Sequence, residues 1–282
     1  MAWSVWLLLA LAATPAAGGG IAWKSGFGEA PLWNDGNAEV SVYEARDIKY
    51  EIPRASRAIL IVVAEDLLPD KLVKADDPAR AAKTVRVLKL NHVRSIPTGV
   101  YVYQQMMSAF LTVGRLDPVK LSVASLEWCG NTFAEWRSDR AALSFRSYFE
   151  TPADADVPLA ARGAVFYDSL PLKLRGLDFE RTREGRLRII ESVFSSHPRP
   201  PSVEEARLFL SRTSDSSRLY RVTVERNEKR DVFDFETGFP HRLVRWERSD
   251  GGSLRLTGSR RLRYWEKNAP GDERLLSSSA TR

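Results

Sequence analysis

The segment SLEWCG, at residues 125–130, holds the residue types with the most direct chemical potential in the chain. On a strand, Glu127 and Cys129 project to the same face. A cysteine thiolate is a nucleophile when a base deprotonates it, and His92 or His241 could supply that base. The sequence thus leaves open a Cys–His enzyme built on Glu127, Cys129 and His241, although Cys129 is more typical of a small buried side chain at a strand end.

A pair of carboxylates is the second catalytic possibility. Acid–base hydrolysis of a glycosidic bond needs two carboxyl groups that face each other across a cleft. Glu65 or Asp66 could pair in this way with Glu127 or Glu150. Because the chain holds 36 acidic residues, such combinations also arise without a function. A true pair would make the protein a hydrolase of an envelope polymer.

Metal and cofactor sites have no sequence signal. The three histidines, His92, His197 and His241, are far apart, and no H-x-x-x-H or C-x-x-C spacing is present. The glycine-rich phosphate-binding patterns G-x-x-x-x-G-K-[ST] and G-x-G-x-x-G are also missing. We therefore expect neither a metal nor a cofactor.

Aromatic side chains in the expected strands offer a binding interpretation instead. Such residues either fill the core or line a pocket for an apolar ligand. The candidates for ligand binding are Tyr101, Tyr103, Trp128, Phe233, Phe235 and Tyr264.

Strands must position these residues, because the dominant pattern from residue 38 onward is alternation with a period of two. In the first half, strands are expected at 39–50, 58–63, 84–90, 99–103, 107–113, 119–128 and 141–149, and a later one at 187–194. The clearest alternation spans 219–266, between connectors at 227–229, 237–240 and 249–252. Connectors this short predict an antiparallel meander.

Helix is expected in only two places. One short helix fits around 165–170, and another fits 203–210, where Ser202 and Glu205 have the spacing of a capping box. The proline-containing segment 65–83 predicts a loop. The fold class is therefore mainly β, a curved antiparallel meander sheet that forms a lipoprotein-carrier-like half-barrel or a sandwich, with one or two short helices. Such a sheet could leave a lipid-sized pocket on its concave face.

The charge of the chain is moderately basic. Lys and Arg total 42 against 36 acidic residues, a formal net charge of +6 that is dispersed along the chain. Dispersed charge does not indicate a nucleic-acid partner and is typical of an ordinary solvated surface. If the charge marks a partner, an anionic lipid, another amphiphile or an envelope polymer is the more natural one. Cys129 is the only cysteine, so no disulfide within the chain is expected.

The N-terminus has the pattern of an export signal. Residues 3–13 form an uncharged apolar run, followed by small, turn-prone residues, which predicts a signal peptide over 1–18. No lipid-accepting cysteine follows that run, so we expect an unlipidated periplasmic or secreted protein. The remaining chain predicts a single β-rich domain at 19–276, a disordered tail at 277–282, and no transmembrane span.

Several short words resemble a known family. They are WNDG at 33–36, TGVYVY at 98–103, SLEWCG at 125–130, SYFE at 147–150, FPH at 239–241, YWEKN at 264–268 and GDE at 271–273. Their order resembles a family of exported bacterial proteins, many of them lipoproteins, that share W-x-D-G, E-W-C-G and Y-W-x-K-N words. Some members carry the label septum formation inhibitor Maf, yet true Maf proteins are cytoplasmic α/β nucleotide pyrophosphatases, which this pattern does not fit. The resemblance implies export and a β fold, and no reaction.

Three functions follow as expectations. The leading one is a non-enzymatic, envelope-associated protein that binds an apolar or amphiphilic ligand on a concave β-sheet. The second is a hydrolase of an envelope polymer that uses Glu127, Cys129 or Glu65. The third is a protein-interaction or assembly module, which would present a long unpaired edge strand.

Overall fold

The computed structural model describes residues 20–77, 83–150, 153–197, 199–213 and 218–277. The expected signal peptide and nearly all of the expected tail therefore lie outside the described residues. Within the described part, no helix has the length and apolar character that a membrane crossing requires.

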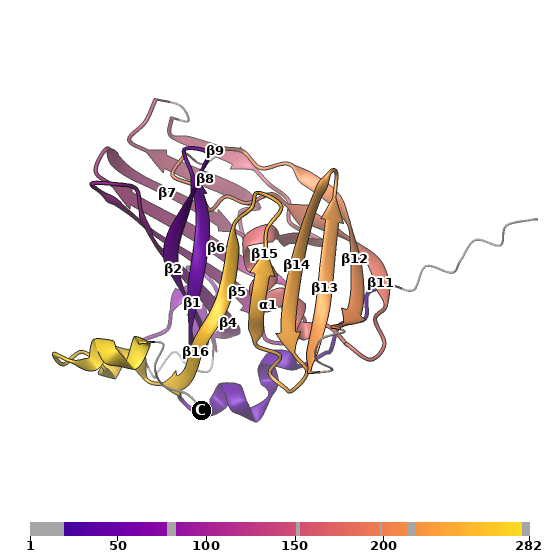
Figure 1. Ribbon diagram of the computed structural model, residues 1–282. Coiled ribbons are helices and arrows are strands. Elements are labelled where there is room, and N and C mark those ends of the chain that lie inside the picture. Colours follow the sequence, from indigo (N-terminus) through magenta and orange to yellow (C-terminus); the bar gives the residue numbers. More distant parts are fainter. Residues whose placement is uncertain (1–19, 78–82, 151–152, 198, 214–217, 278–282) are drawn as a thin grey trace, which may run out of the picture.

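Sixteen strands of the described chain form one curved sheet (Figure 1). The strands of the first half are β1 (Ala38–Lys49), β2 (Ile52–Leu68), β3 (Val73–Lys74), β4 (Val85–Pro97), β5 (Val102–Thr112), β6 (Pro118–Glu127), β7 (Gly130–Arg137), β8 (Ala142–Ser147) and β9 (Ala155–Pro158). Those of the second half are β10 (Ala164–Phe166), β11 (Glu184–Ile190), β12 (Val203–Arg212), β13 (Leu219–Arg226), β14 (Lys229–Glu236), β15 (Leu243–Glu247) and β16 (Ser253–Leu262).

Helical structure is confined to short segments. The α-helix α1 covers Leu170–Lys173. The 3₁₀ turns are η1 (Phe27–Glu29), η2 (Pro31–Asn34), η4 (Tyr167–Ser169), η5 (Leu174–Gly176), η6 (Tyr264–Glu266) and η7 (Asp272–Leu276). The expectation of a mainly β protein with little helix is confirmed.

The sheet is an open, mostly antiparallel meander. Its order runs from β10 through β16 to β1, then through β2, β4 and β5 to β9, with β3 beside β2. Pairing of β16 with β1 joins the two halves, from Ala38 opposite Leu262 to Arg46 opposite Ser253. The two free edges, β9 and β10, are joined by residues 159–163 without pairing to each other. The predicted meander of the C-terminal part is confirmed, because hairpins of β13, β14, β15 and β16 follow the expected connectors.

The concave face is filled by residues 164–177, which comprise β10 and the short helical turns after it and which we call the plug. Phe166, Leu170, Leu172 and Leu174 are fully buried there, and Figure 1 shows α1 enclosed by the sheet. The alternating residues of the strands supply the facing layer; Phe233, for example, is fully buried. The concave side is therefore a packed core rather than an open lipid-sized cavity.

Leu170 tests this packing. We expect Leu170→Ala to lower the free energy of unfolding by about 2–5 kcal/mol, because the leucine is fully buried in the plug and its removal leaves a cavity. Urea unfolding followed by circular dichroism measures the change. The matched substitution Leu126→Ala, at a side chain that is 53% exposed, should have a much smaller effect. Equal effects would contradict a packed concave core.

The helix predicted at 203–210 is wrong. This segment is the strand β12, paired with β11 on one side and β13 on the other. Its burial has a period of two, since Ala206 and Leu208 are buried and their neighbours are exposed or partly exposed. The capping-box spacing does not act as a cap here, because the backbone of Ser202 pairs with Glu191 across the β11–β12 turn. Pairing with two neighbouring strands has overridden a local helix signal.

Two smaller expectations also need correction. The loop predicted from residue 65 begins later, because β2 continues to Leu68 and the short strand β3 follows. The helix expected around 165–170 begins as the strand β10, and its helical turns start at Tyr167. Residues 65–67 belong to a strand despite their two acids, because they pair with β4. Residues 164–166 are apolar and all buried, so periodicity does not separate strand from helix there.

Candidate functional site

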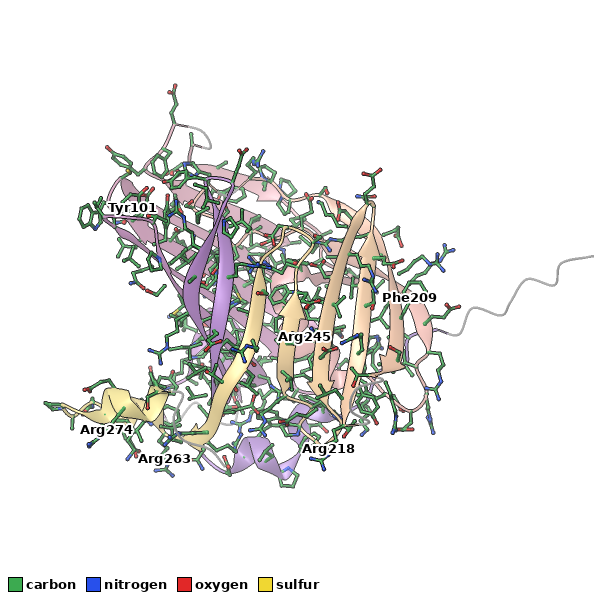
Figure 2. All side chains as sticks on the ribbon, in the orientation of Figure 1. Tyr101, Phe209, Arg218, Arg245, Arg263 and Arg274 are labelled. Atoms are coloured by element: carbon green, nitrogen blue, oxygen red, sulfur yellow. The ribbon has the colours of Figure 1, made fainter. Side chains whose placement is uncertain are left out.

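One end of the sheet carries an exposed aromatic surface, which we call the aromatic rim. It consists of Tyr50 in the β1–β2 turn, Tyr101 in the β4–β5 turn, Trp128 in the β6–β7 turn and Tyr148 after β8. Tyr50, Trp128 and Tyr148 are 59%, 76% and 74% exposed, and Val100 beside them is 84% exposed. Figure 2 places Tyr101 at the tip of its hairpin, at the end of the molecule opposite Arg218.

The aromatic rim is held together by direct contacts. The Tyr50 hydroxyl bonds to the hydroxyls of Tyr101 and Tyr103, the latter at 2.7 Å. The rings of Tyr101 and Trp128 lie 6.0 Å apart between centroids. The Lys49 ammonium lies 4.2 Å from the centroid of the Tyr103 ring. The structure thus brings together Tyr101, Tyr103 and Trp128 from the predicted ligand-binding set.

Gly130 lets the aromatic rim continue toward β8. A Cβ atom at Gly130 would lie 2.4 Å from the ring of Tyr148, so only glycine allows this approach. Beyond Tyr148, the ring of Phe149 stacks on His197 at 4.6 Å. Below Trp128 the convex face also exposes Leu126. Exposed apolar side chains therefore extend beyond the aromatic rim itself.

The remaining predicted ligand-binding residues lie elsewhere. Phe233 and Phe235 on β14 are fully buried in the core. Tyr264 lies in η6, beyond the other end of β16, beside Trp265. None of these three contributes to the aromatic rim.

Sequence reasoning missed Tyr50 as a rim residue. A signal was available: in an antiparallel meander every second turn lies at the same end of the sheet. The turns at 50–51, 98–101 and 128–129 and the connector that starts at Tyr148 share one end, and each carries a tyrosine or tryptophan.

Glu127 and Cys129 sit within the aromatic rim. Glu127 is 8% exposed, and its carboxylate accepts a hydrogen bond of 3.4 Å from the backbone N–H of Cys129. The expectation that Cys129 is buried is wrong, because its side chain is exposed at the tip of the β6–β7 hairpin. The negative charge of Glu127 raises the pKa of the Cys129 thiol. An activated nucleophile needs the opposite shift.

Alkylation of Cys129 tests this arrangement. We expect iodoacetamide to modify Cys129 in the folded protein, with a pH midpoint above that of a free thiol, because the nearby carboxylate disfavours the thiolate. Glu127→Gln should move the midpoint to lower pH and raise the rate at pH 7. Mass spectrometry of modified protein against time measures both rates. Modification only after denaturation would contradict an exposed thiol.

Neither candidate base faces the thiol. His241 lies in the β14–β15 turn, 4.7 Å from Phe179 between ring centroids. That turn lies at the end of the sheet opposite Cys129. Its backbone contacts Arg218, which Figure 2 shows at that end: the backbone N–H of Thr237 donates to the carbonyl of Arg218. His92 is buried against Phe194, and this burial holds its pKa well below the usual value. The described residues therefore do not assemble a Cys–His pair.

The proposed carboxylate pairs are also separated. Glu65 forms an ion pair with Lys89 at 2.5 Å, and Asp66 forms one with Arg86 at 2.6 Å. Both acids lie near the end of β2 that leads to β3, whereas Glu127 lies beside the turn at the other end. Glu150 is exposed beyond β8. In the described part of the chain, no group of three His, Cys, Asp or Glu side chains could hold a metal ion.

A buried charge cluster lies behind the aromatic rim. Asp47 on β1 accepts hydrogen bonds of 3.1 Å from both Arg94 on β4 and Arg248 at the β15–β16 turn, and one of 2.7 Å from Ser56. Burial alone would raise the pKa of Asp47, but the two arginines and Ser56 outweigh it, so the pKa is lowered. The cluster ties together strands that carry the rim and its neighbouring turns.

No family model, no curated protein and no solved structure matches this chain. The resemblance to the exported family stays an expectation, and function is inferred from geometry.

Proposed function

We propose that the protein is an exported, non-enzymatic lipid-binding protein that docks on a membrane surface through its aromatic rim. The observation that carries the proposal is the gathering of exposed or partly exposed aromatic side chains, Tyr50, Tyr101, Trp128 and Tyr148, on turns at one end of the sheet. Exposed apolar areas of this kind mark interaction sites. Tyrosine and tryptophan are the residues that concentrate where bilayers meet water.

The chemistry of the aromatic rim favours a lipid surface. Each ring has an apolar body and a polar tip, so the body can enter the acyl boundary while the hydroxyl or indole N–H stays among the headgroups. Lys49 lies among the tyrosines, and the chain has a formal net charge of +6, which favours anionic lipids. The concave face is packed, so it offers no comparable apolar surface.

The two other expected functions gain no support. The candidate catalytic groups do not converge. A protein-interaction module of the expected kind would show a long unpaired strand, but the described free edges are β9, which ends in Pro158, and the three-residue β10. Short edges and proline protect a sheet against pairing with another chain.

Cosedimentation with vesicles tests the proposal. We expect the full chain to bind vesicles of phosphatidylcholine and phosphatidylglycerol, with affinity rising with the phosphatidylglycerol fraction and falling at high salt. Because residues 3–13 are themselves apolar, binding is compared with the same full chain carrying rim substitutions. Binding that is equal in wild type and rim variants, or no binding at all, would contradict the proposal.

A further inference from the structure

A pocket lies beside the β9–β10 connector, at the end of the sheet away from the aromatic rim. It has a volume of about 750 Å³, within the range of small-molecule sites. Residues 160–163 of the β9–β10 connector and 164–165 of β10 form one side of it, and the β5–β6 and β7–β8 turns form another. Residues of β10 and β11, which lie at one free edge of the sheet, complete the wall.

Part of the pocket wall is apolar. Trp23, Trp136, Ala161, Val165 and Leu187 line it. The indole N–H of Trp136 donates to the carbonyl of Leu159 at 2.9 Å, so its polar atom is already satisfied within the protein. An acyl chain against this wall would be removed from water without leaving a polar group unpaired.

The rest of the wall is strongly cationic. Arg115, Arg162, Lys173 and Arg186 line the pocket, and Asp117 is the single acidic residue among its lining residues. Among the described residues, no carboxylate forms an ion pair with Arg162 or Arg186. The pocket thus has a surplus of positive charge that its own residues do not balance.

Lys173 is the most constrained of these cations. Its side chain is 5% exposed, and its ammonium donates to the carbonyl of Arg115 at 2.7 Å and to Asp117 at 3.4 Å. The ammonium also lies 4.3 Å from the centroid of the Trp23 ring. A buried cation beside an aromatic wall is suited to an anion with an apolar body, because the two features contact different parts of one ligand.

We propose that this pocket binds one anionic amphiphile with a single acyl chain. The chain lies against Trp23 and Trp136, and the anionic head lies near Lys173, Arg162 and Arg186. A fatty acid and a lysophospholipid share this chemistry. Ligand binding in this pocket does not depend on membrane docking through the aromatic rim. The pocket lies at the opposite end of the sheet, and its ligand is bound from solution.

Binding of a fluorescent fatty acid, below its micelle concentration and without vesicles, tests the proposal. We expect saturable binding to the full chain that oleate displaces and that oleyl alcohol, which has the same chain without the charge, displaces at least about tenfold less well. Lysophosphatidate in a parallel arm distinguishes the two sources of the anion. Equal displacement by oleate and oleyl alcohol would overturn the cationic site.

Variants locate the ligand. Arg162→Gln combined with Arg186→Gln should weaken oleate binding about tenfold or more. Among the described residues these two side chains form no ion pair, so the substitutions remove no ion pair that stabilises the fold. Ala160→Trp, at an exposed lining position, should block the pocket. Trp128→Ala should leave oleate binding unchanged, which separates this site from the aromatic rim. Unchanged oleate binding in both pocket variants would overturn the proposal.

Discussion

Replacing Trp128 and Tyr101 together by alanine should weaken binding to phosphatidylglycerol-containing vesicles by at least about tenfold. Trp128 is 76% exposed in the free protein, so a membrane can take up most of its ring. Transfer of a large apolar side chain out of water is favourable by about 1.5–3 kcal/mol. Each 1.4 kcal/mol changes a binding constant about tenfold. Cosedimentation at several lipid concentrations measures the shift.

The matched control is Trp265→Ala. Trp265 is 48% exposed in η6, beyond the end of β16 that is opposite the aromatic rim. Its loss removes a comparable ring without changing the rim, so vesicle binding should stay within about twofold of wild type. Equal losses from the rim double variant and from Trp265→Ala would show that aromatic content, and not the aromatic rim, determines binding.

Substitution of Asp47 should have a large effect on stability. Asp47→Asn removes the negative charge that Arg94 and Arg248 share. All three side chains are buried or nearly so: Arg94 is 11% exposed, Arg248 is 7% exposed and Asp47 is 2% exposed. Breaking a buried ion pair by removing one partner costs about 3–5 kcal/mol, because the other charge stays buried without compensation. Arg94 would lose its ion-pair partner, whereas Arg248 would keep its pair with Asp250 at 3.1 Å. We expect a loss of this size in urea unfolding.

The pH dependence of stability gives a second measurement on Asp47. Its pKa is lowered in the folded state, so its stabilising contribution is present above the unfolded pKa of about 3.9 and is lost as the pH falls through the folded pKa. Wild type should therefore lose more stability than Asp47→Asn below about pH 4. Glu44→Gln, at a strongly exposed pair with Arg255, should change stability by less than about 1 kcal/mol. Parallel acid profiles for wild type and Asp47→Asn would contradict a structural role for this charge.

The sequence was sufficient where structure is set by local patterns. The hairpins of the C-terminal part could be predicted because alternation and short connectors both act within a few residues. The strand β12 could not, because Ser202 and Glu205 mimic a helix start and only the neighbours β11 and β13 decide the outcome. The packed concave face was also beyond prediction, since the plug at 164–177 is separated in sequence from most strands that it covers.

The candidate site was predictable only in part. Tyr101, Tyr103 and Trp128 were selected for their type, and their convergence depends on the register of β4, β5 and β6. The sequence could also have shown that His241 lies far from Cys129. Successive turns of a meander alternate between the two ends of the sheet, which places the 237–242 turn at the end opposite Cys129. The pocket beside the β9–β10 connector could not be foreseen, because its four cations come from four separate places in the chain and only the tertiary fold brings them together.

The position of Cys129 allows the most direct test of the central claim, that the aromatic rim faces the membrane. A polarity-sensitive fluorophore on this single, exposed thiol reports on the rim itself. The matched reference is a Cys129→Ser, Gly238→Cys variant that carries the label at position 238. This position is exposed, has open space around it and lies in the β14–β15 turn, at the end of the sheet opposite the aromatic rim. On vesicle binding, we expect the label at 129 to shift to the blue and to be quenched by a lipid-borne quencher, and the label at 238 to stay accessible to aqueous iodide. A label at 129 that stays open to iodide while the protein sediments with vesicles would contradict membrane docking through the aromatic rim.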